Sequence, residues 1–364
     1  MLKRLILIFI LISSVHHINA THYQFKHYDS NDGLSQNSVL SICQDHIGFM
    51  WFGTRNGLCR FDGKSFRTYR RSELPGALGN DHISTIFQGP NNELWIGTDC
   101  GLYIYSPISD SFRLLNEKAN DGTTITGTVN IIVSNKKKIY IASLGQGVFV
   151  YDIASKKLVH HALKDTPAIM SMAIGDNDTV WVGCFQSGLH YTQDNFAHIL
   201  AYKDVQNNYI LKKHSITGIV IKGQDLFFSS STNGLHKLHF PSRTVSSCIT
   251  SHDGKGLFAH SLLSINDNLL MMTETGLFVY NISNGSQCFY KEEATNPYSL
   301  SDDHLQTAFL DKDGGIWIGT YFGGVNYSPN MSYTFVNYFP RVDIATSLYG
   351  KRVRPIDEDS AGRI

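Results

Sequence analysis

The sequence of 364 residues lacks an excess of charge of either sign and lacks several patterns that define other protein classes. Its 31 lysine and arginine residues match 31 aspartate and glutamate residues, so no net field would draw it to nucleic acid or to an anionic membrane surface. Residues 21–364 contain no long stretch with the 3.6-residue periodicity of helices, which argues against helical repeats. The six cysteines include no Cys-x-x-Cys pair, and we expect isolated buried thiols rather than a disulfide scaffold.

Motifs of catalytic, metal and cofactor sites are also missing. There is no His-Glu-x-x-His motif, no Cys/His cluster with metal-binding spacing and no nucleophile elbow. Gly145-Gln146-Gly147 lacks the third glycine and the following helix of a dinucleotide-binding loop. Residues 311–315 begin like a calcium loop, but Phe322 stands at the twelfth position, where a bidentate glutamate is needed. The sequence therefore predicts no catalytic residue, no metal and no cofactor.

The one long apolar run lies at the start of the chain. Lys3 and Arg4 precede a run from Leu5 to Val15, and the segment ends on the small residue Ala20. This order is typical of a secretory signal peptide, here residues 1–20, with cleavage after Ala20. The alternative, an uncleaved membrane anchor, requires a longer run to span the ~30 Å of a bilayer core. We therefore expect an exported protein.

A short apolar stretch with a tryptophan returns along the whole chain. Leu94–Leu102 reads as a strand, a tight turn that needs glycine, and the start of a second strand. All four tryptophans occupy one position of this repeat: Trp51, Trp95, Trp181 and Trp317. Weaker copies centred on Tyr140, Phe227 and Leu270 complete a period of roughly 41–47 residues. We interpret the tryptophans as packing residues between neighbouring sheets rather than as platforms for sugar stacking.

Each repeat holds four short strand patterns separated by turns. In the first repeat they lie at Val39–Cys43, around Trp51, at Gly57–Phe61 and at Ser65–Tyr69. Four short strands repeated at roughly 40–50 residues are the signature of propeller blades. We predict an all-β fold over residues 21–330, a seven-bladed β-propeller of four-stranded antiparallel blades.

The two ends of the repeat array predict how the ring closes. His22–Tyr28 is a strand without a blade of its own, and it would supply the outer strand of the seventh blade and hide a free edge. Tyr333–Tyr338 is a further strand, and Asp359–Ile364 matches Asp311–Ile316, which precedes Trp317. We expect residues 331–364 to be the truncated opening strands of a second propeller, and the chain to be a fragment.

The repeat resembles that of two-component regulator propellers. The element Asp-x-x-Gly-x-Ile-Trp-Ile-Gly-Thr, followed by Gly-Leu, stands at Asp45–Leu58 and Asp311–Val325 with partial copies between. The opening Phe25–Val39 is similar to the first mature residues of hybrid two-component sensors from glycan-degrading Gram-negative bacteria, and Gly319–Tyr327 resembles the blade that ends their first propeller. The likeness covers nearly all of residues 21–364, and it is weak in the fifth and sixth repeats.

The resemblance implies the organisation of a longer protein. Such sensors are similar in carrying two periplasmic propellers, an immunoglobulin-like domain, one membrane helix, and then kinase, receiver and DNA-binding domains. It implies oligosaccharide sensing in the periplasm, anchoring in the inner membrane, a homodimer at full length and histidine phosphorylation inside the cell. Partners of this region would be the oligosaccharide, the second propeller and the downstream domains, with no nucleic acid contact.

Function in a propeller is expected where the repeat varies, in the loops on one face. Exposed aromatic side chains beside amides, carboxylates and arginine suit a sugar ring, which offers apolar C–H faces and many hydroxyls. The candidate ligand-binding residues in these loops are Tyr321, Phe322, Arg55, Asp99, Phe185, Gln186, His82 and His304. For any single one of them, a solvated loop residue is the alternative reading.

Two other functions stay open at this stage. An exported propeller can be an enzyme that acts on polysaccharide, or a scaffold that docks other proteins, because fold does not fix function. An enzyme needs convergent acids, bases or a metal in a pocket, and the sequence offers no candidate set. We therefore favour a binding module without catalysis.

Overall fold

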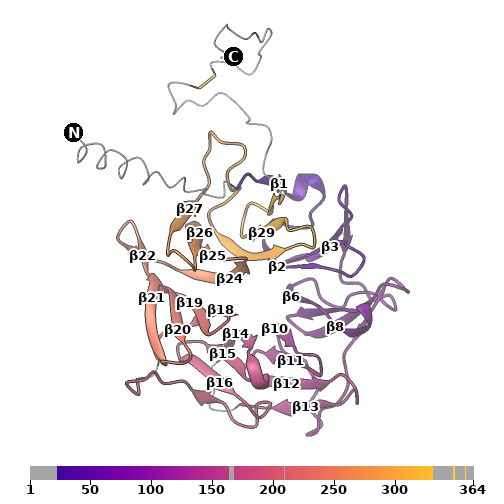
Figure 1. Cartoon of the computed structure of the whole chain (residues 1–364). Helices are drawn as coiled ribbons and strands as arrows, with labels where there is room; N and C mark the ends of the chain where they lie inside the picture. The colour runs from indigo at the N-terminus through magenta and orange to yellow at the C-terminus, as the bar shows by residue number, and fades with distance from the viewer. Residues whose placement is uncertain (1–22, 164–167, 209, 331–346, 349–356, 358–364) are drawn as a thin grey trace, which may run out of the picture.

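The computed structural model describes residues 23–163, 168–208, 210–330, 347–348 and 357. Within them the chain forms seven four-stranded antiparallel sheets set in a ring around a central opening (Figure 1). The predicted seven-bladed propeller is thus confirmed. The predicted signal peptide lies outside the described residues, and so do the predicted strands of a second propeller between 331 and 364.

The strands of each blade are given from the central opening outward (Figure 1). Blades 1 to 4 consist of β2 (Val39–Gln44), β3 (Met50–Thr54), β4 (Gly57–Phe61) and β5 (Phe66–Tyr69); β6 (Ile83–Gln88), β7 (Leu94–Thr98), β8 (Gly101–Ser106) and β9 (Ser111–Leu114); β10 (Val129–Ser134), β11 (Lys138–Ser143), β12 (Gly147–Asp152) and β13 (Leu158–His161); and β14 (Ile169–Ile174), β15 (Val180–Cys184), β16 (Gly188–Thr192) and β17 (Leu200–Ala201). Blades 5 to 7 consist of β18 (Ile216–Lys222), β19 (Asp225–Ser230), β20 (Gly234–His239) and β21 (Thr244–Ile249); β24 (Ala259–Ile265), β25 (Asn268–Thr273), β26 (Gly276–Asn281) and β27 (Gln287–Tyr290); and β28 (Leu305–Leu310), β29 (Ile316–Thr320), β30 (Val325–Ser328) and β1 (Lys26–Tyr28).

Short elements decorate this ring. A small hairpin, which the sequence did not predict, joins blades 5 and 6. It consists of β22 (Ser251–His252) and β23 (Lys255–Gly256). Three single 3-10 turns are η1 (Ser30–Asp32), η2 (Pro90–Asn92) and η3 (Asp176–Asp178). No helix long and apolar enough to cross a membrane occurs in the part of the chain that the structure describes.

The ring is closed by the first strand of the chain. β1 pairs antiparallel with β30, with Lys26 opposite Tyr327 and Tyr28 opposite Val325. Just before β1, the side chain of Phe25 is buried among residues of blades 6 and 7. The predicted closure by the N-terminal strand is confirmed for the three residues of β1. The free edge of blade 7 is therefore covered, as an exposed edge strand requires.

The aspartate of the repeat motif fixes the turn between the first two strands of a blade. Asp45 accepts hydrogen bonds from the backbone N–H groups of residues 47–49, and its other oxygen accepts the indole N–H of Trp51 at 2.8 Å. Asp311 does the same for its own turn and for Trp317, also at 2.8 Å. One buried carboxylate thus satisfies several buried or half-buried donors at once, which explains its place in the motif.

The glycine and the threonine of the motif have separate roles. A β-carbon on Gly53 would lie 2.7 Å from Ile83 Cγ2, so the second strand of blade 1 approaches the first strand of blade 2 too closely for a side chain. The Thr54 hydroxyl donates to the carbonyl of Gly57 at 2.8 Å and closes the tight turn that follows. These contacts set the spacing between blades and the shape of the turns on one face.

The hydrophobic core lies between neighbouring blades. Trp51 packs with Leu94 and Ile96 of blade 2, and Trp317 packs with Phe52 of blade 1. All four tryptophans are buried. The prediction that they pack between sheets is confirmed. All six cysteines are free, but only three are buried, because Cys100 is exposed in a turn and two others are half-buried.

Candidate functional site

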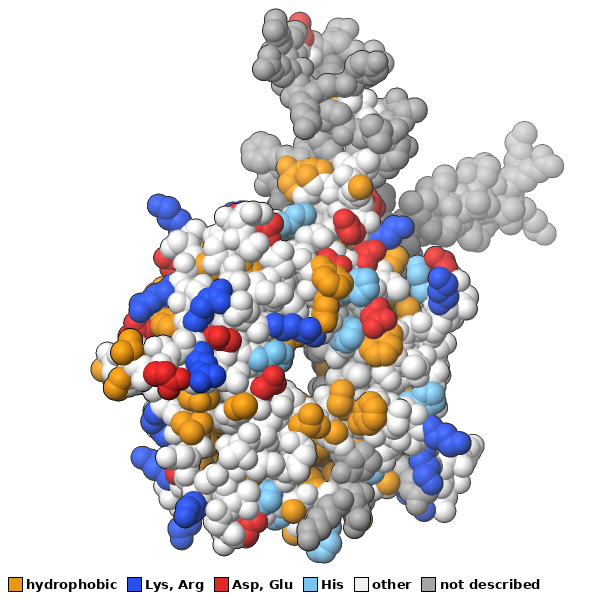
Figure 2. All heavy atoms as spheres, turned by 180° about the vertical axis from the view of Figure 1, so that it is seen from behind, with side chains coloured by type: hydrophobic (Ala, Val, Ile, Leu, Met, Phe, Trp, Pro, Cys, Tyr) orange, Lys and Arg blue, Asp and Glu red, His pale blue; other side chains and the backbone are white. Residues whose placement is uncertain are grey.

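The candidate residues share one face of the propeller. Because successive strands are antiparallel, the turns between the second and third strands and the links between blades lie at the same end of every blade. We call this end the link face. Figure 2 shows a face on which hydrophobic, histidine and acidic side chains gather around the central opening.

Arg55 and Tyr321 meet where the ring closes. Arg55 lies in the β3–β4 turn of blade 1 and Tyr321 in the β29–β30 turn of blade 7. The Arg55 Cζ atom lies 4.4 Å from the centroid of the Tyr321 ring, a cation–π contact. The Tyr321 N–H donates to the carbonyl of His304 at 2.9 Å, which ties this turn to the link that enters blade 7.

Phe322 projects from the same turn and is 62% exposed. Its ring lies edge-on to those of Tyr321 and His304, with centroids 4.6 and 5.7 Å apart. The buried carboxylate of Asp302 accepts the Phe322 N–H at 2.8 Å and the His304 N–H at 3.0 Å. Asp302 therefore fixes the backbone that presents the two aromatic rings, so the turn is held rather than free to collapse.

Blade 6 adds residues that the sequence reading missed. His260 Nε2 lies 3.8 Å from Glu274 Oε1, and the rings of Phe258 and His260 are 5.0 Å apart. Burial lowers the pKa of His260; Glu274 opposes that shift and the nearby His304 adds to it. A signal was present in the sequence, because Phe258 precedes the first strand of its blade as His304 does in blade 7.

We name this group the junction cluster: Arg55, Tyr321, Phe322, Asp302, His304, His260, Glu274 and Phe258. It spans blades 1, 7 and 6 on the link face and combines apolar rings, a guanidinium, carboxylates and imidazoles. Four of the eight predicted site residues are thus brought together at one place: Arg55, Tyr321, Phe322 and His304.

The other predicted residues lie elsewhere on the link face. In blade 2, His82 Nδ1 lies 3.2 Å from Asp99 Oδ1, so these two form a pair of their own. Phe185 and Gln186 occupy the β15–β16 turn of blade 4, across the ring from blade 7 (Figure 1). The Phe185 N–H donates to the carbonyl of Ala168 at 2.8 Å, and the Phe185 side chain is exposed. The eight residues therefore form a ring of separate groups rather than one compact site.

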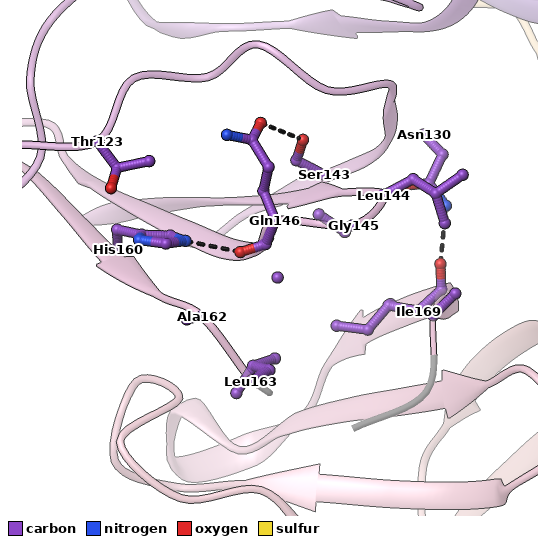
Figure 3. A pocket seen from close by; sticks show the side chains of 13 residues that line it. Thr123, Asn130, Ser143, Leu144, Gly145, Gln146, His160, Ala162, Leu163 and Ile169 are labelled. Carbon is purple, nitrogen blue, oxygen red and sulfur yellow. Dashed lines mark hydrogen bonds between the residues drawn. The ribbon is translucent and has the colours of Figure 1, made fainter. Parts of the chain in front are cut away.

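A pocket of about 730 Å³ opens on the same face between blades 3 and 4 (Figure 3). Gln146 stands in its wall, and its Oε1 accepts the backbone N–H groups of Thr126 and Gly127 at 2.9 and 2.6 Å. The ring of His160 is within 2.6 Å of the carbonyl of Gln146 and within 2.7 Å of Asp121. These side chains already form hydrogen bonds within the protein, so the pocket walls offer few free polar groups to a ligand.

Comparison with known proteins identifies the repeat. Residues 33–56, 77–100 and 299–322 match the sequence pattern of the family described as two component regulator propeller. Three segments of the chain therefore match the two-component regulator propeller repeat. The three matched segments belong to blades 1, 2 and 7, and each ends in the turn that holds Arg55, Asp99 or Tyr321.

Three known proteins that are similar to parts of this chain are longer than the chain. The histidine kinase P4 of Formosa agariphila is 50% identical over 52 residues, which are 14% of this chain and 4% of the kinase. The extracellular domain of a protein designated a hybrid two-component system in B. thetaiotaomicron matches with a TM-score of 0.72 and 24% identity, over 85% of this chain and 42% of that chain. The extracellular domain of a protein designated a one-component system in the same organism matches with a TM-score of 0.69 and 21% identity, over 84% of this chain and 40% of that chain. The chain spans less than half of each, and the two solved structures establish the fold alone.

Proposed function

We propose that this propeller is the exported, ligand-sensing part of a hybrid two-component sensor histidine kinase and that its ligand is an oligosaccharide. The observation that carries the proposal is the junction cluster. Phe322 is 62% exposed, and Asp302 fixes the backbone of the turn that carries it. A large aromatic side chain that is kept exposed in this way is typical of a binding site.

The chemistry of the cluster matches that of a sugar. The rings of Tyr321 and Phe322 offer apolar surface for the C–H faces of a pyranose. Arg55 supplies donors and Glu274 supplies acceptors for hydroxyl groups, which both donate and accept. A cluster with both signs of charge and two aromatic rings favours a polyhydroxylated ligand over a purely apolar or purely ionic one.

The proposed site is completed by a second propeller. The similar proteins extend well beyond the length of this chain, and blade 7 is the last blade before residue 331. A following ring would face the junction cluster across a cleft, and clefts between domains are preferred ligand sites. In this arrangement Tyr321 and Phe322 contact the oligosaccharide, Arg55 and Asp99 flank it, and the present chain holds half of the site.

The same proposal covers location and partners. The N-terminal segment directs export to the periplasm, and the long sensor is a homodimer anchored in the inner membrane with its kinase inside. Binding of a glycan fragment outside then regulates genes for glycan utilisation. This region binds and does not catalyse.

An experiment separates sensing from catalysis. The exported region of the long protein, from residue 21 through the second propeller, is incubated with pools of glycan fragments, and bound and free sugars are analysed by mass spectrometry. We expect selective retention of a fragment whose mass does not change. Shortened or unsaturated products would instead show a polysaccharide enzyme that uses His and carboxylate groups of this face, and retention of proteins but no glycan would show a docking scaffold.

A further inference from the structure

A second site lies on the opposite face of the propeller, between blades 4 and 5. The turns Gly175–Thr179 and Thr192–Leu200 and residue Phe240 lie at the end of the blades away from the link face. They border a pocket of about 300 Å³ lined by Gly175, Asp176, Thr179, Trp181, Tyr191, Gln193, Tyr202, Ile221 and Phe240. None of these residues belongs to the junction cluster.

The pocket arises from one change in the repeat. Gly175 stands where Asp45 and Asp311 stand in blades 1 and 7, six residues before the tryptophan. In those blades the carboxylate accepts the indole N–H at 2.8 Å. In blade 4 no carboxylate is there, and among the described residues no hydrogen-bond partner is found for the indole N–H of Trp181, a residue only 6% exposed. Because Trp181 lines the pocket, an acceptor that enters the pocket can reach this donor.

Blade 2 shows that the missing carboxylate alone does not make a site. Gly89 also replaces the aspartate and leaves the Trp95 indole nitrogen buried without a partner among the described residues, but a β-carbon at Gly89 would lie 2.4 Å from the Trp95 ring, which fills the space. At Gly175 the nearest atoms to a β-carbon are Ile221 Cδ1 at 3.2 Å and Trp181 Nε1 at 3.3 Å. Trp181 of blade 4 thus borders the pocket, whereas the indole nitrogen of blade 2 is enclosed.

The walls of the pocket are aromatic. Tyr202 meets Trp181 edge-on with ring centroids 5.1 Å apart, and Tyr191 meets Tyr202 edge-on at 5.8 Å. Phe240 stacks on the face of Trp181 at 5.4 Å, so the tryptophan offers its N–H edge and not its face. The tyrosine rings are half-buried and leave apolar surface toward the pocket.

We infer that this pocket binds a single neutral pyranose ring. A sugar hydroxyl accepts the Trp181 N–H in place of the missing carboxylate and donates to Asp176, while the C–H faces pack on Tyr191 and Tyr202. A hydroxyl meets both demands because it is at once acceptor and donor, whereas a carboxylate ligand would be repelled by Asp176. The volume is at the low end of the ~300–1,000 Å³ of ligand pockets, which fits one ring rather than a chain.

Nuclear magnetic resonance on the whole chain tests this inference. The four tryptophans give four indole N–H signals, and the W181F variant assigns that of Trp181. The probes are methyl β-D-glucopyranoside, methyl β-D-galactopyranoside and methyl α-D-mannopyranoside, titrated to about 100 mM, since single sugars bind in the millimolar range. We expect at least one of them to shift the Trp181 signal saturably and to leave the other three in place.

Two variants give the matched controls. G175D introduces the carboxylate that blades 1 and 7 have, and this carboxylate should accept the hydrogen bond of the Trp181 indole N–H. The variant should therefore have a higher melting temperature and should give no saturation-transfer signal from the sugar. W181F keeps the pocket but removes the donor, and it should weaken binding about threefold to tenfold. The inference is overturned if none of the three probes moves the Trp181 signal, or if the sugar signal is as strong in G175D and W181F as in the wild type. Neither result bears on the junction cluster, which lies on the other face.

Discussion

The guanidinium of Arg55 lies over the ring of Tyr321, with 4.4 Å between Cζ and the ring centroid, and this contact joins the first blade of the ring to the last. An exposed cation–π contact contributes about 0.5–1 kcal/mol. A double-mutant cycle of R55A and Y321A should therefore give a coupling free energy of that size by chemical denaturation. Additive effects of the two substitutions would show that the contact does not stabilise the junction.

Closure by β1 makes Phe25 important for stability. The side chain is 2% exposed and packs with Leu270, Met272 and Leu300. F25A should lower the free energy of unfolding by about 3–5 kcal/mol, because it leaves a cavity at the seam. The control K26A removes an exposed side chain whose ammonium group lies 4.7 Å from the Tyr28 ring centroid, and it should cost no more than about 1 kcal/mol.

Deletion of residues 21–28 extends this test from packing to pairing. It removes β1 and leaves the outer edge of β30 unpaired, so the protein should associate, as seen by light scattering. A deletion variant that stays monomeric and as stable as the parent would show that the ring closes in another way.

The carboxylate of Asp311 should contribute more to the stability of the fold than that of Asp313. It accepts two backbone N–H groups and the indole N–H of Trp317, all of them buried or half-buried. D311A leaves these donors without a partner and should cost about 1–3 kcal/mol in urea denaturation. D313A, in the same turn but exposed, is the matched control and should stay within about 0.5 kcal/mol of the wild type. Equal effects of both would contradict the role given to the motif aspartate.

His236 should make the propeller sensitive to acid. Its side chain is buried against Phe228, and burial lowers the pKa of the imidazole below its ordinary value. The unfolded chain then binds more protons below pH ~6.5, so this contribution is full above that pH and is lost as the pH falls toward the folded-state pKa. The loss is at most about 1.4 kcal/mol per pH unit.

The measurement compares urea denaturation at neutral and mildly acidic pH. H236Q should lose less stability than the wild type between the two conditions, since the titrating group is gone. H46Q removes an exposed histidine and should lose as much as the wild type. If H236Q and the wild type respond alike, the buried imidazole does not govern the acid response.

The fold could be predicted from the sequence because each residue of the repeat motif has a structural role within or next to its own blade. Trp51 and Trp317 mark the second strand, Gly53 permits close approach of blades, and Asp45 fixes a turn, so each copy shows the same pattern. The closure by β1 followed from counting strands. The start of blade 6 was less clear from the sequence, because the hairpin of β22 and β23 that precedes β24 has no repeat signal.

The site was predictable only in part. The contact of Arg55 with Tyr321 joins residues far apart in the sequence, and it depends on which blade follows which around a closed ring. His260 and Glu274 were missed because each lies in a weak copy of the repeat. The pocket beside Gly175 was missed for another reason: a glycine in place of aspartate reads as an ordinary turn until the indole N–H it leaves without a partner is seen.

Calorimetry on two lengths of the protein tests the central claim most directly. The glycan fragment retained by the two-propeller region is titrated into that region, into its Y321A and F322A variants, and into the present chain. We expect clear binding by the wild-type long protein, at least a tenfold loss in either variant, about 1.4 kcal/mol or more, and little or no binding by the present chain. Tight binding by the present chain, or unchanged affinity in both variants, would contradict the placement of the oligosaccharide at the junction cluster.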